Sequence, residues 1–200
     1  MVVNDYLNGE RSMLALILVV VTIYLVIYII RLRNNIVMTE NSLKRSWSDV
    51  ASYSRQRCKI LDSLEPLVKD YISYESKILT DIIKLREDIN KLDTSEADIE
   101  GLSNIEKRTN SLMSNLRMQV ENYPNLKADR LFLNLMDEIT SQNENVGAAI
   151  VVFNNNVEAF NNQIEIFPNN IINDLLLHKK KRREFTDSAT RDIEFDPGLS

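Results

Sequence analysis

The 200-residue chain is predicted to be all-α: an N-terminal transmembrane helix followed by an antiparallel bundle of three to four long helices. Eighteen consecutive residues, from Met13 to Ile30, carry no charge, Pro or Gly. Beyond them, apolar residues recur at alternating spacings of three and four, as in helices that bury one stripe. The chain holds only four Gly and four Pro, which is typical of long helices rather than of sheets with many turns.

The apolar run predicts a membrane anchor over residues 13–32, preceded by a short tail, residues 1–12. A helix of the run's length extends about 27 Å, close to the ~30 Å core of a bilayer. A buried core helix is one alternative. A cleaved signal peptide is another, but no small-x-small cleavage site follows the run. Because basic residues such as Arg31 and Arg33 follow it, we expect the tail outside and the larger part in the cytoplasm.

Four apolar stripes in residues 33–168 predict the helices of the bundle. They cover Ile36–Leu61, Leu64–Leu92, Leu102–Val120 and Ile139–Phe167. We expect the first stripe to continue from the membrane helix with little interruption.

Breaks between the stripes are predicted from turn and capping residues. Asp93–Glu96 supplies polar and N-capping residues. Tyr123–Pro124 and Phe167–Pro168 should end helices, because the residue before a proline leaves the α region. Pro66 lies inside a stripe and should either kink a helix or mark a separate start after Asp62–Ser63. Residues 169–200 are expected to form a tail that is first basic and then acidic.

The composition excludes several functions. With 29 acidic and 24 basic residues, the chain is not expected to bind nucleic acid. Its one cysteine, Cys58, cannot form an internal disulfide, and its one histidine, His178, cannot build a His-based metal site alone. No Gly-rich phosphate loop or nucleophile–base pair is present, so we predict no catalytic, cofactor-binding or metal-binding residue and no enzyme.

Several side chains are candidates for structural or interface roles. Glu75 falls on a stripe, where a buried carboxylate needs a partner such as Arg57 or Arg117; a position at the stripe's edge, open to water, is the alternative. Arg86 is expected to be a solvated helix residue. Trp47, on a stripe, is predicted to anchor the core.

Asparagines and a basic run mark the C-terminal part. Asn154 and Asn161 are seven residues apart, so they share a helix flank and are expected to bond to a neighbouring helix or chain. Residues 170–185 could form a short amphipathic helix. Its basic run either contacts anionic lipid or is a solvated charge run at a helix C-terminus. That run consists of Lys179, Lys180, Lys181, Arg182 and Arg183.

Two segments carry a family resemblance. Residues 121–128, Glu-Asn-Tyr-Pro-Asn-Leu-Lys-Ala, are followed by Phe132, Leu135 and Glu138, and Phe-Asn pairs occur at 153–154 and 160–161 before Phe167–Pro168. Residues 13–168 thus resemble the LemA family of bacterial membrane-anchored helical proteins. Further matching positions are Trp47, Ser48, Arg57, Lys69, Tyr71, Glu75, Leu79 and Arg86.

The resemblance adds Tyr123, Pro124 and Lys127 to the candidate structural or interface residues, and it implies the bacterial cytoplasmic (inner) membrane as location. Where the family has a Glu and an Arg, this chain has Asn143 and Ile150. The family has no well-established enzymatic activity.

We therefore expect a non-enzymatic, membrane-anchored scaffold that contacts lipid through its N-terminal helix and self-associates into a homo-oligomer. A more specific version is an assembly that organises or shapes membrane. The alternative is an adaptor that binds another membrane protein, such as a stress protease or a transport component.

Overall fold

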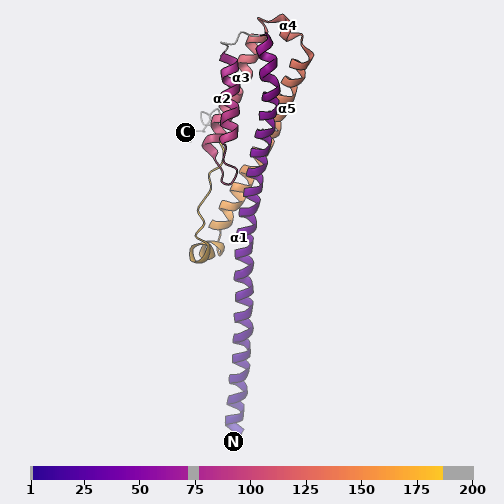
Figure 1. Cartoon of the computed structure of the whole chain (residues 1–200). Coiled ribbons are helices and arrows are strands. Elements are labelled where there is room, and N and C mark those ends of the chain that lie inside the picture. Colours follow the sequence, from indigo (N-terminus) through magenta and orange to yellow (C-terminus); the bar gives the residue numbers. More distant parts are fainter. Residues whose placement is uncertain (1, 72–76, 187–200) are drawn as a thin grey trace, which may run out of the picture. The chain divides into compact units, whose positions relative to one another are not determined.

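The computed structural model describes residues 2–71 and 77–186, and they are almost entirely helical (Figure 1). No strand occurs among these residues, so the predicted all-α class is confirmed. The elements are α1 (Val2–Tyr71), α2 (Lys77–Lys91), α3 (Ile99–Val120), α4 (Pro124–Lys127), α5 (Arg130–Glu165), α6 (Asn169–Ile172) and a π-helical turn, η1 (Asn173–Leu177).

The first helix is continuous over 70 residues and joins the apolar run to the first stripe, as expected. It also contains residues 2–12, which the sequence set apart as a tail. Pro66 lies inside α1, so the alternative of a separate helix start after Ser63 is wrong. Proline removes one backbone hydrogen bond, but Leu64 and Val68 on either side are fully buried, and their packing holds the helical path.

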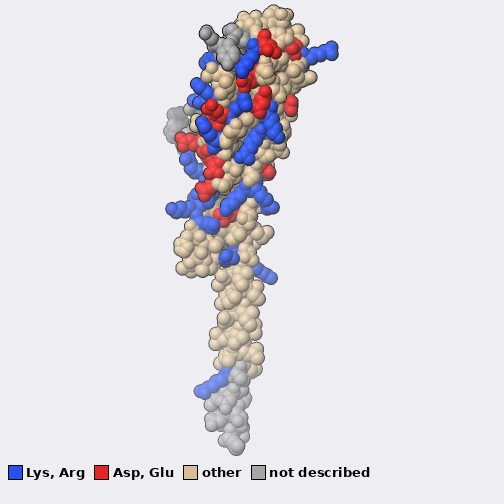
Figure 2. All heavy atoms as spheres, in the orientation of Figure 1, with Lys and Arg blue, Asp and Glu red and all other residues tan. Residues whose placement is uncertain are grey.

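The apolar run of α1 is the one helical stretch in the described part of the chain that is long and apolar enough to cross a membrane. Its mean hydropathy is 3.0, and every side chain from Met13 to Ile30 is exposed. Figure 2 shows an uncharged surface along this stretch. Full exposure is opposite to what a core helix of a soluble protein shows, and it is compatible with a single-pass membrane anchor.

The chain divides into two compact units that share α1 and α5. The anchor unit consists of residues 1–41 and 159–181, and the bundle unit of residues 42–158 and 182–200. These boundaries differ from those suggested by the sequence, which separated anchor from bundle at residue 32 and bundle from tail at residue 168. Each unit is described separately below.

In the bundle unit, parts of α1 and α5 pack with α2 and α3 as an antiparallel bundle. The predicted stripes point into its core: Trp47, Leu61, Ile82, Leu112 and Phe153 are all buried. Along α1 and α5 the residue numbers of contacting pairs change in opposite directions, from Trp47–Phe153 to Tyr71–Asp129. The same holds for α2 and α3, from Asp81–Asn115 to Asp88–Arg108, so both pairs of helices are antiparallel.

Three helix boundaries differ in detail from the expectation. The stripe Leu64–Leu92 is divided between α1 and α2, with residues 72–76 outside the described part. The N-cap of α3 is Asp98 rather than a residue of Asp93–Glu96; its Oδ1 accepts a 2.8 Å hydrogen bond from the backbone N–H of Gly101. The amphipathic helix expected over residues 170–185 is shortened to α6 and η1, and residues 178–186 are not helical.

In the anchor unit, α1 is packed against the end of α5, α6 and η1. Burial along α1 begins at Leu32, which is half-buried, and is complete at Ile36. The buried side chains of this unit from the other elements are Phe160, Ile164, Asn169, Ile172 and Asn173. The segments after residue 159 therefore meet α1 immediately after its apolar run.

Candidate functional site

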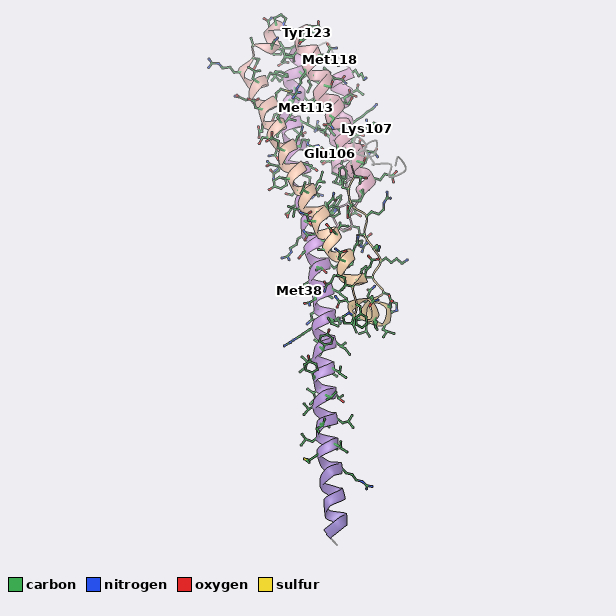
Figure 3. All side chains as sticks on the ribbon, turned by 180° about the vertical axis from the view of Figure 1, so that it is seen from behind. Met38, Glu106, Lys107, Met113, Met118 and Tyr123 are labelled. Atoms are coloured by element: carbon green, nitrogen blue, oxygen red, sulfur yellow. The ribbon has the colours of Figure 1, made fainter. Side chains whose placement is uncertain are left out.

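The most deeply buried charge of the bundle unit is Arg57 on α1, whose side chain is 0% exposed. Its Nη1 donates to Glu106 Oε1 at 3.0 Å and to Thr109 Oγ1 at 2.6 Å, both on α3, where Figure 3 labels Glu106. Its Nε and Nη2 are buried without a hydrogen-bond partner among the described residues. A buried guanidinium held by one carboxylate and one hydroxyl fixes the register of α1 against α3 rather than adding stability by itself.

Glu75, for which Arg57 or Arg117 was a possible partner and a water-exposed position the alternative, lies outside the described residues. Arg86, expected to be solvated, is instead half-buried on α2 and bridges two carboxylates of α1, Asp62 and Glu65. The pKa of Glu65 is lowered, mainly by the hydrogen bond that its carboxylate accepts from Lys69 and further by the Arg86 guanidinium. Arg86 is therefore a structural residue that joins α2 to α1.

Cys58 lies beside this bridge and is buried. Burial raises the pKa of its thiol, and the neighbouring Asp62 carboxylate raises it further. Since the thiolate is the reactive form, the Cys58 thiol is a poor nucleophile at neutral pH. It is a structural residue in this arrangement.

Trp47 anchors the core, as predicted. Its ring lies 5.4 Å from that of Phe153 on α5 at a tilted angle of 57°, a favourable aromatic arrangement. The indole Nε1–H donates a 3.0 Å hydrogen bond to the backbone carbonyl of Asp93, in the turn after α2. One side chain therefore ties α1 to α5 and to the α2–α3 turn.

Asn154 bonds to a non-helical segment of the same chain rather than to the neighbouring helix or chain that was expected. Its Nδ2 donates to the carbonyl oxygen of Phe185 at 2.8 Å, and its Oδ1 accepts from the N–H of Phe185 at 2.9 Å. This two-way pairing satisfies a backbone that lies outside any helix and buries the Phe185 ring. Asn161 lies half-buried on the same flank of α5.

The segment Tyr123–Lys127 forms the turn between α3 and α5. Pro124 is the first residue of α4, where a proline costs no hydrogen bond, and Leu126 is fully buried while Lys127 is exposed. The motif is a structural turn.

A contact that the sequence analysis missed closes the same end of the bundle unit. Tyr71, the last residue of α1, donates from its hydroxyl to Asp129 Oδ2 at 2.9 Å. Asp129 Oδ1 accepts from the N–H groups of Leu131 and Phe132, so Asp129 caps α5. The Tyr71 bond lowers the pKa of Asp129 and raises the pKa of Tyr71. The available sequence signal for this cap was an Asp five residues after Pro124, since Asp is a favoured N-cap residue.

Lys179 and Lys181 of the basic run at 179–183 form ion pairs within the anchor unit. Lys179 Nζ lies 2.8 Å from Glu40 Oε2 and 3.0 Å from Oε1, in the anchor unit. Lys181 pairs with Glu165 on the exposed surface of α5. Whether the run contacts lipid or is a solvated charge run stays a prediction, whereas the Lys179 side chain forms a contact within the chain.

An uncharged surface on α5 is the main exposed feature of the bundle unit. No charge occurs from Asn145 to Val157, yet Gly147, Ala148, Val151 and Val152 are all exposed. We call these four residues the α5 patch. A groove of about 320 Å³ beside it is lined from α1 by Ser46, Asp49 and Tyr53, and from α5 by Asn145, Ala148, Ala149 and Val152.

Within the described residues, no group of three or more His, Cys, Asp or Glu side chains is placed to hold a metal ion. What the structure presents is buried ties between helices, an exposed uncharged patch and a single candidate membrane span. The fold and these features define a class of protein: a helical bundle that carries one N-terminal helix able to cross a membrane.

Comparison with known proteins narrows this class. A family model described as LemA family matches residues 46–195, and the chain therefore belongs to the LemA family. The match extends past residue 168, where the resemblance read from the motifs ended. Protein LemA of Metamycoplasma hominis is 25% identical over 132 residues, which are 66% of this chain and 58% of that protein. The chain thus aligns with less than two thirds of that relative's length.

Proposed function

We propose that this chain is a membrane-anchored scaffold, not an enzyme, that self-associates through the α5 patch. The observation that carries the proposal is the exposure of this patch. Small side chains such as Gly147 and Ala148 let a second helix approach closely, and Val151 and Val152 provide apolar area to bury. The groove between Ala148 and Tyr53 continues this surface toward α1.

The proposed membrane anchor favours a second copy as the occupant of the patch. Copies held by a single span are confined to two dimensions and to one orientation, which raises their effective concentration. We propose the bacterial cytoplasmic membrane as the location, with the bundle unit in the cytoplasm, because basic residues follow the apolar run. Assembly that organises or shapes membrane is the more specific form of the proposal.

Cross-linking of the full chain in membranes tests self-association. Val152→Cys in a Cys58→Ser background places one thiol in the patch; serine at 58 keeps a donor toward Asn90 Oδ1. A short bis-maleimide should give a dimer band. Met118→Cys, exposed on α3 outside the patch, is the matched control and should give much less.

Gly147→Trp provides the blocking variant. A Cβ at Gly147 meets no atom within 4 Å, so the bulky side chain is accommodated in the monomer and the melting temperature should not fall. The dimer band of Val152→Cys should then decrease at least several-fold. A monomer at high protein concentration in mild detergent, without cross-linking in membranes, would overturn the proposal. Recovery of a different membrane protein in stoichiometric amount would favour the adaptor function instead.

A further inference from the structure

A second apolar surface lies in the anchor unit, in residues 166–177, which we call the apolar segment. It comprises the residues after α5, together with α6 and η1. Phe167 is 75% exposed and Leu175 is 68% exposed. The exposed large apolar side chains of the segment are Ile166, Phe167, Ile171, Leu175 and Leu176. A cluster of this kind marks a binding surface.

The apolar segment is held beside the start of the packed part of α1. Ile172 of the segment is buried, and so is Ile36 of α1 in the same unit. Asn173 closes the segment: its Nδ2 donates to the carbonyl oxygen of Lys179 at 3.0 Å, and its Oδ1 accepts from the Lys179 N–H at 2.9 Å. The Lys179 side chain then pairs with Glu40 of α1.

These ties place the segment at the membrane edge of the anchor unit. Burial along α1 starts at Leu32, two residues after the apolar run ends at Ile30. At the helical rise of ~1.5 Å per residue, Ile36 lies about 6 Å beyond Leu32, the end of the predicted anchor, which is within the headgroup layer of a bilayer. In Figure 1 the segment coils beside α1, and the part of it visible in Figure 2 is largely uncharged.

The charges around the segment match anionic lipid. Arg31 and Arg33 on α1 are exposed, and so is Lys180 after the segment. Asp174 is the one acidic residue between positions 166 and 183. An apolar surface bordered by basic side chains is the composition of elements that lie in the membrane interface.

We propose that the apolar segment is a second, non-spanning membrane contact, which inserts its exposed apolar side chains among the lipid headgroups and upper acyl chains. The occupant of this surface is the bilayer in which the anchor stands. The inference rests on the proposed membrane anchor and is independent of self-association. It gives the anchor unit two membrane contacts, so that the bundle unit is attached through a base wider than one helix.

Depth-dependent quenching in vesicles tests the proposal with the full chain. Single cysteines in the Cys58→Ser background carry the environment-sensitive dye NBD at three positions. Leu175→Cys reports the apolar segment, and Leu25→Cys reports the span. Met38→Cys, exposed on α1 about 12 Å beyond Ile30, reports the aqueous side and is labelled in Figure 3. The vesicles contain phosphatidylcholine and phosphatidylglycerol, with or without acyl-chain doxyl lipid.

The expected result is quenching at Leu175→Cys of about half that at Leu25→Cys or more, with a blue-shifted emission, since interfacial elements insert to ~5–10 Å. Met38→Cys should stay weakly quenched. Lys180→Gln, or vesicles without phosphatidylglycerol, should lower the signal at Leu175→Cys and leave Leu25→Cys unchanged.

Three outcomes overturn the inference, and they are distinguishable. If Leu175→Cys behaves like Met38→Cys while Leu25→Cys is quenched, the anchor holds and the apolar segment does not enter the membrane. If none of the three labels is quenched, the anchor itself fails. Should cross-linking through Leu175→Cys occur without quenching, the segment contacts a second copy rather than lipid, which also contradicts the proposal.

Discussion

Lys179 and Glu40 are 139 residues apart in the sequence and form a two-point contact, with Nζ 3.0 Å from Oε1 and 2.8 Å from Oε2. The glutamate is 9% exposed and the lysine 33% exposed, so the pair is shielded on the carboxylate side. It connects the non-helical chain after η1 to α1 within the anchor unit. This tie decides whether the apolar segment is held against α1 or released.

Lys179→Met should loosen the apolar segment. The change leaves the nearly buried Glu40 carboxylate without the Lys179 ammonium beside it, which costs about 1–3 kcal/mol. Hydrogen exchange of the full chain in detergent should therefore be ~5–100-fold faster at the amides of residues 169–179, since 1.4 kcal/mol is tenfold. Lys181→Met, which breaks the exposed pair with Glu165, is the matched control and should change exchange little. Equal effects of the two variants would contradict the assignment.

Arg57→Ala should destabilise the bundle unit strongly. It removes the buried side chain that joins α1 to Glu106 and Thr109 of α3, and breaking such a buried pair costs about 3–5 kcal/mol. Arg57→Met should cost less, because it refills the volume and leaves a Glu106 carboxylate that can reach water. Thermal unfolding of the full chain in detergent, followed by circular dichroism, measures both.

The matched control for Arg57 is Arg108→Ala. Arg108 pairs with Asp88 across α2 and α3 but is 46% exposed, so its loss should cost no more than about 1 kcal/mol. A similar melting temperature for Arg57→Ala and Arg108→Ala would show that burial of Arg57 does not determine stability.

Asp129→Asn should change the dependence of stability on acid pH. The hydrogen bond from Tyr71, followed by backbone N–H bonds, holds the pKa of Asp129 below its usual 3.8 in the folded chain. The unfolded chain therefore binds the proton more readily, and the stabilisation by Asp129 is present above the unfolded pKa and lost as pH falls through the folded pKa. Denaturant titrations from pH 5 down should show a shallower loss of stability in Asp129→Asn. Asp137→Asn, exposed on α5, should keep the slope of the unchanged chain.

Tyr71→Phe tests the same contact from the alkaline side. The Asp129 hydrogen bond and charge raise the pKa of Tyr71 above 10.0. This stabilisation is complete below the unfolded pKa and is lost as pH rises through the folded pKa. Stability of Tyr71→Phe should thus lack the decline near and above pH ~10 that the unchanged chain shows. An identical alkaline decline in both chains would contradict the Tyr71–Asp129 contact.

Asn154→Ala should release the chain around Phe185. Both polar groups of its amide pair with the Phe185 backbone, and losing them leaves a donor and an acceptor unsatisfied at about 1–2 kcal/mol. The Phe185 amide should exchange faster by ~5–30-fold, while the α5 amides stay protected. Asn155→Ala, exposed on the next position of α5, is the control and should leave that amide unchanged.

Local chemistry made much of the fold predictable. The spacing of apolar residues gave the helices, and Pro124 and Pro168 marked helix ends because proline restricts the residue before it. Trp47 could be assigned to the core from its stripe position. The N-cap of α3 was harder to predict. Asp93 and Asp98 both suit an N-cap, and only the path of the turn selects Asp98.

The partners of polar residues could not be predicted in the same way. The sequence offered Arg57 only as a possible partner of Glu75, whereas in the structure it pairs with Glu106 on α3. Arg86 was expected to be solvated, but the two carboxylates that it bridges belong to another helix, which the local sequence does not reveal.

The sequence by itself determined that this protein is helical, that one stretch is long and apolar enough to cross a bilayer, and where the chain turns. Those properties depend on residues close together in the chain, through hydrogen bonding, capping and side-chain period. Only the tertiary structure decided that Lys179 returns to Glu40, that Asn154 holds Phe185, and that apolar side chains remain exposed at residues 166–177. Such contacts join residues far apart in sequence, and packing in three dimensions selects them from many partners of equal local suitability.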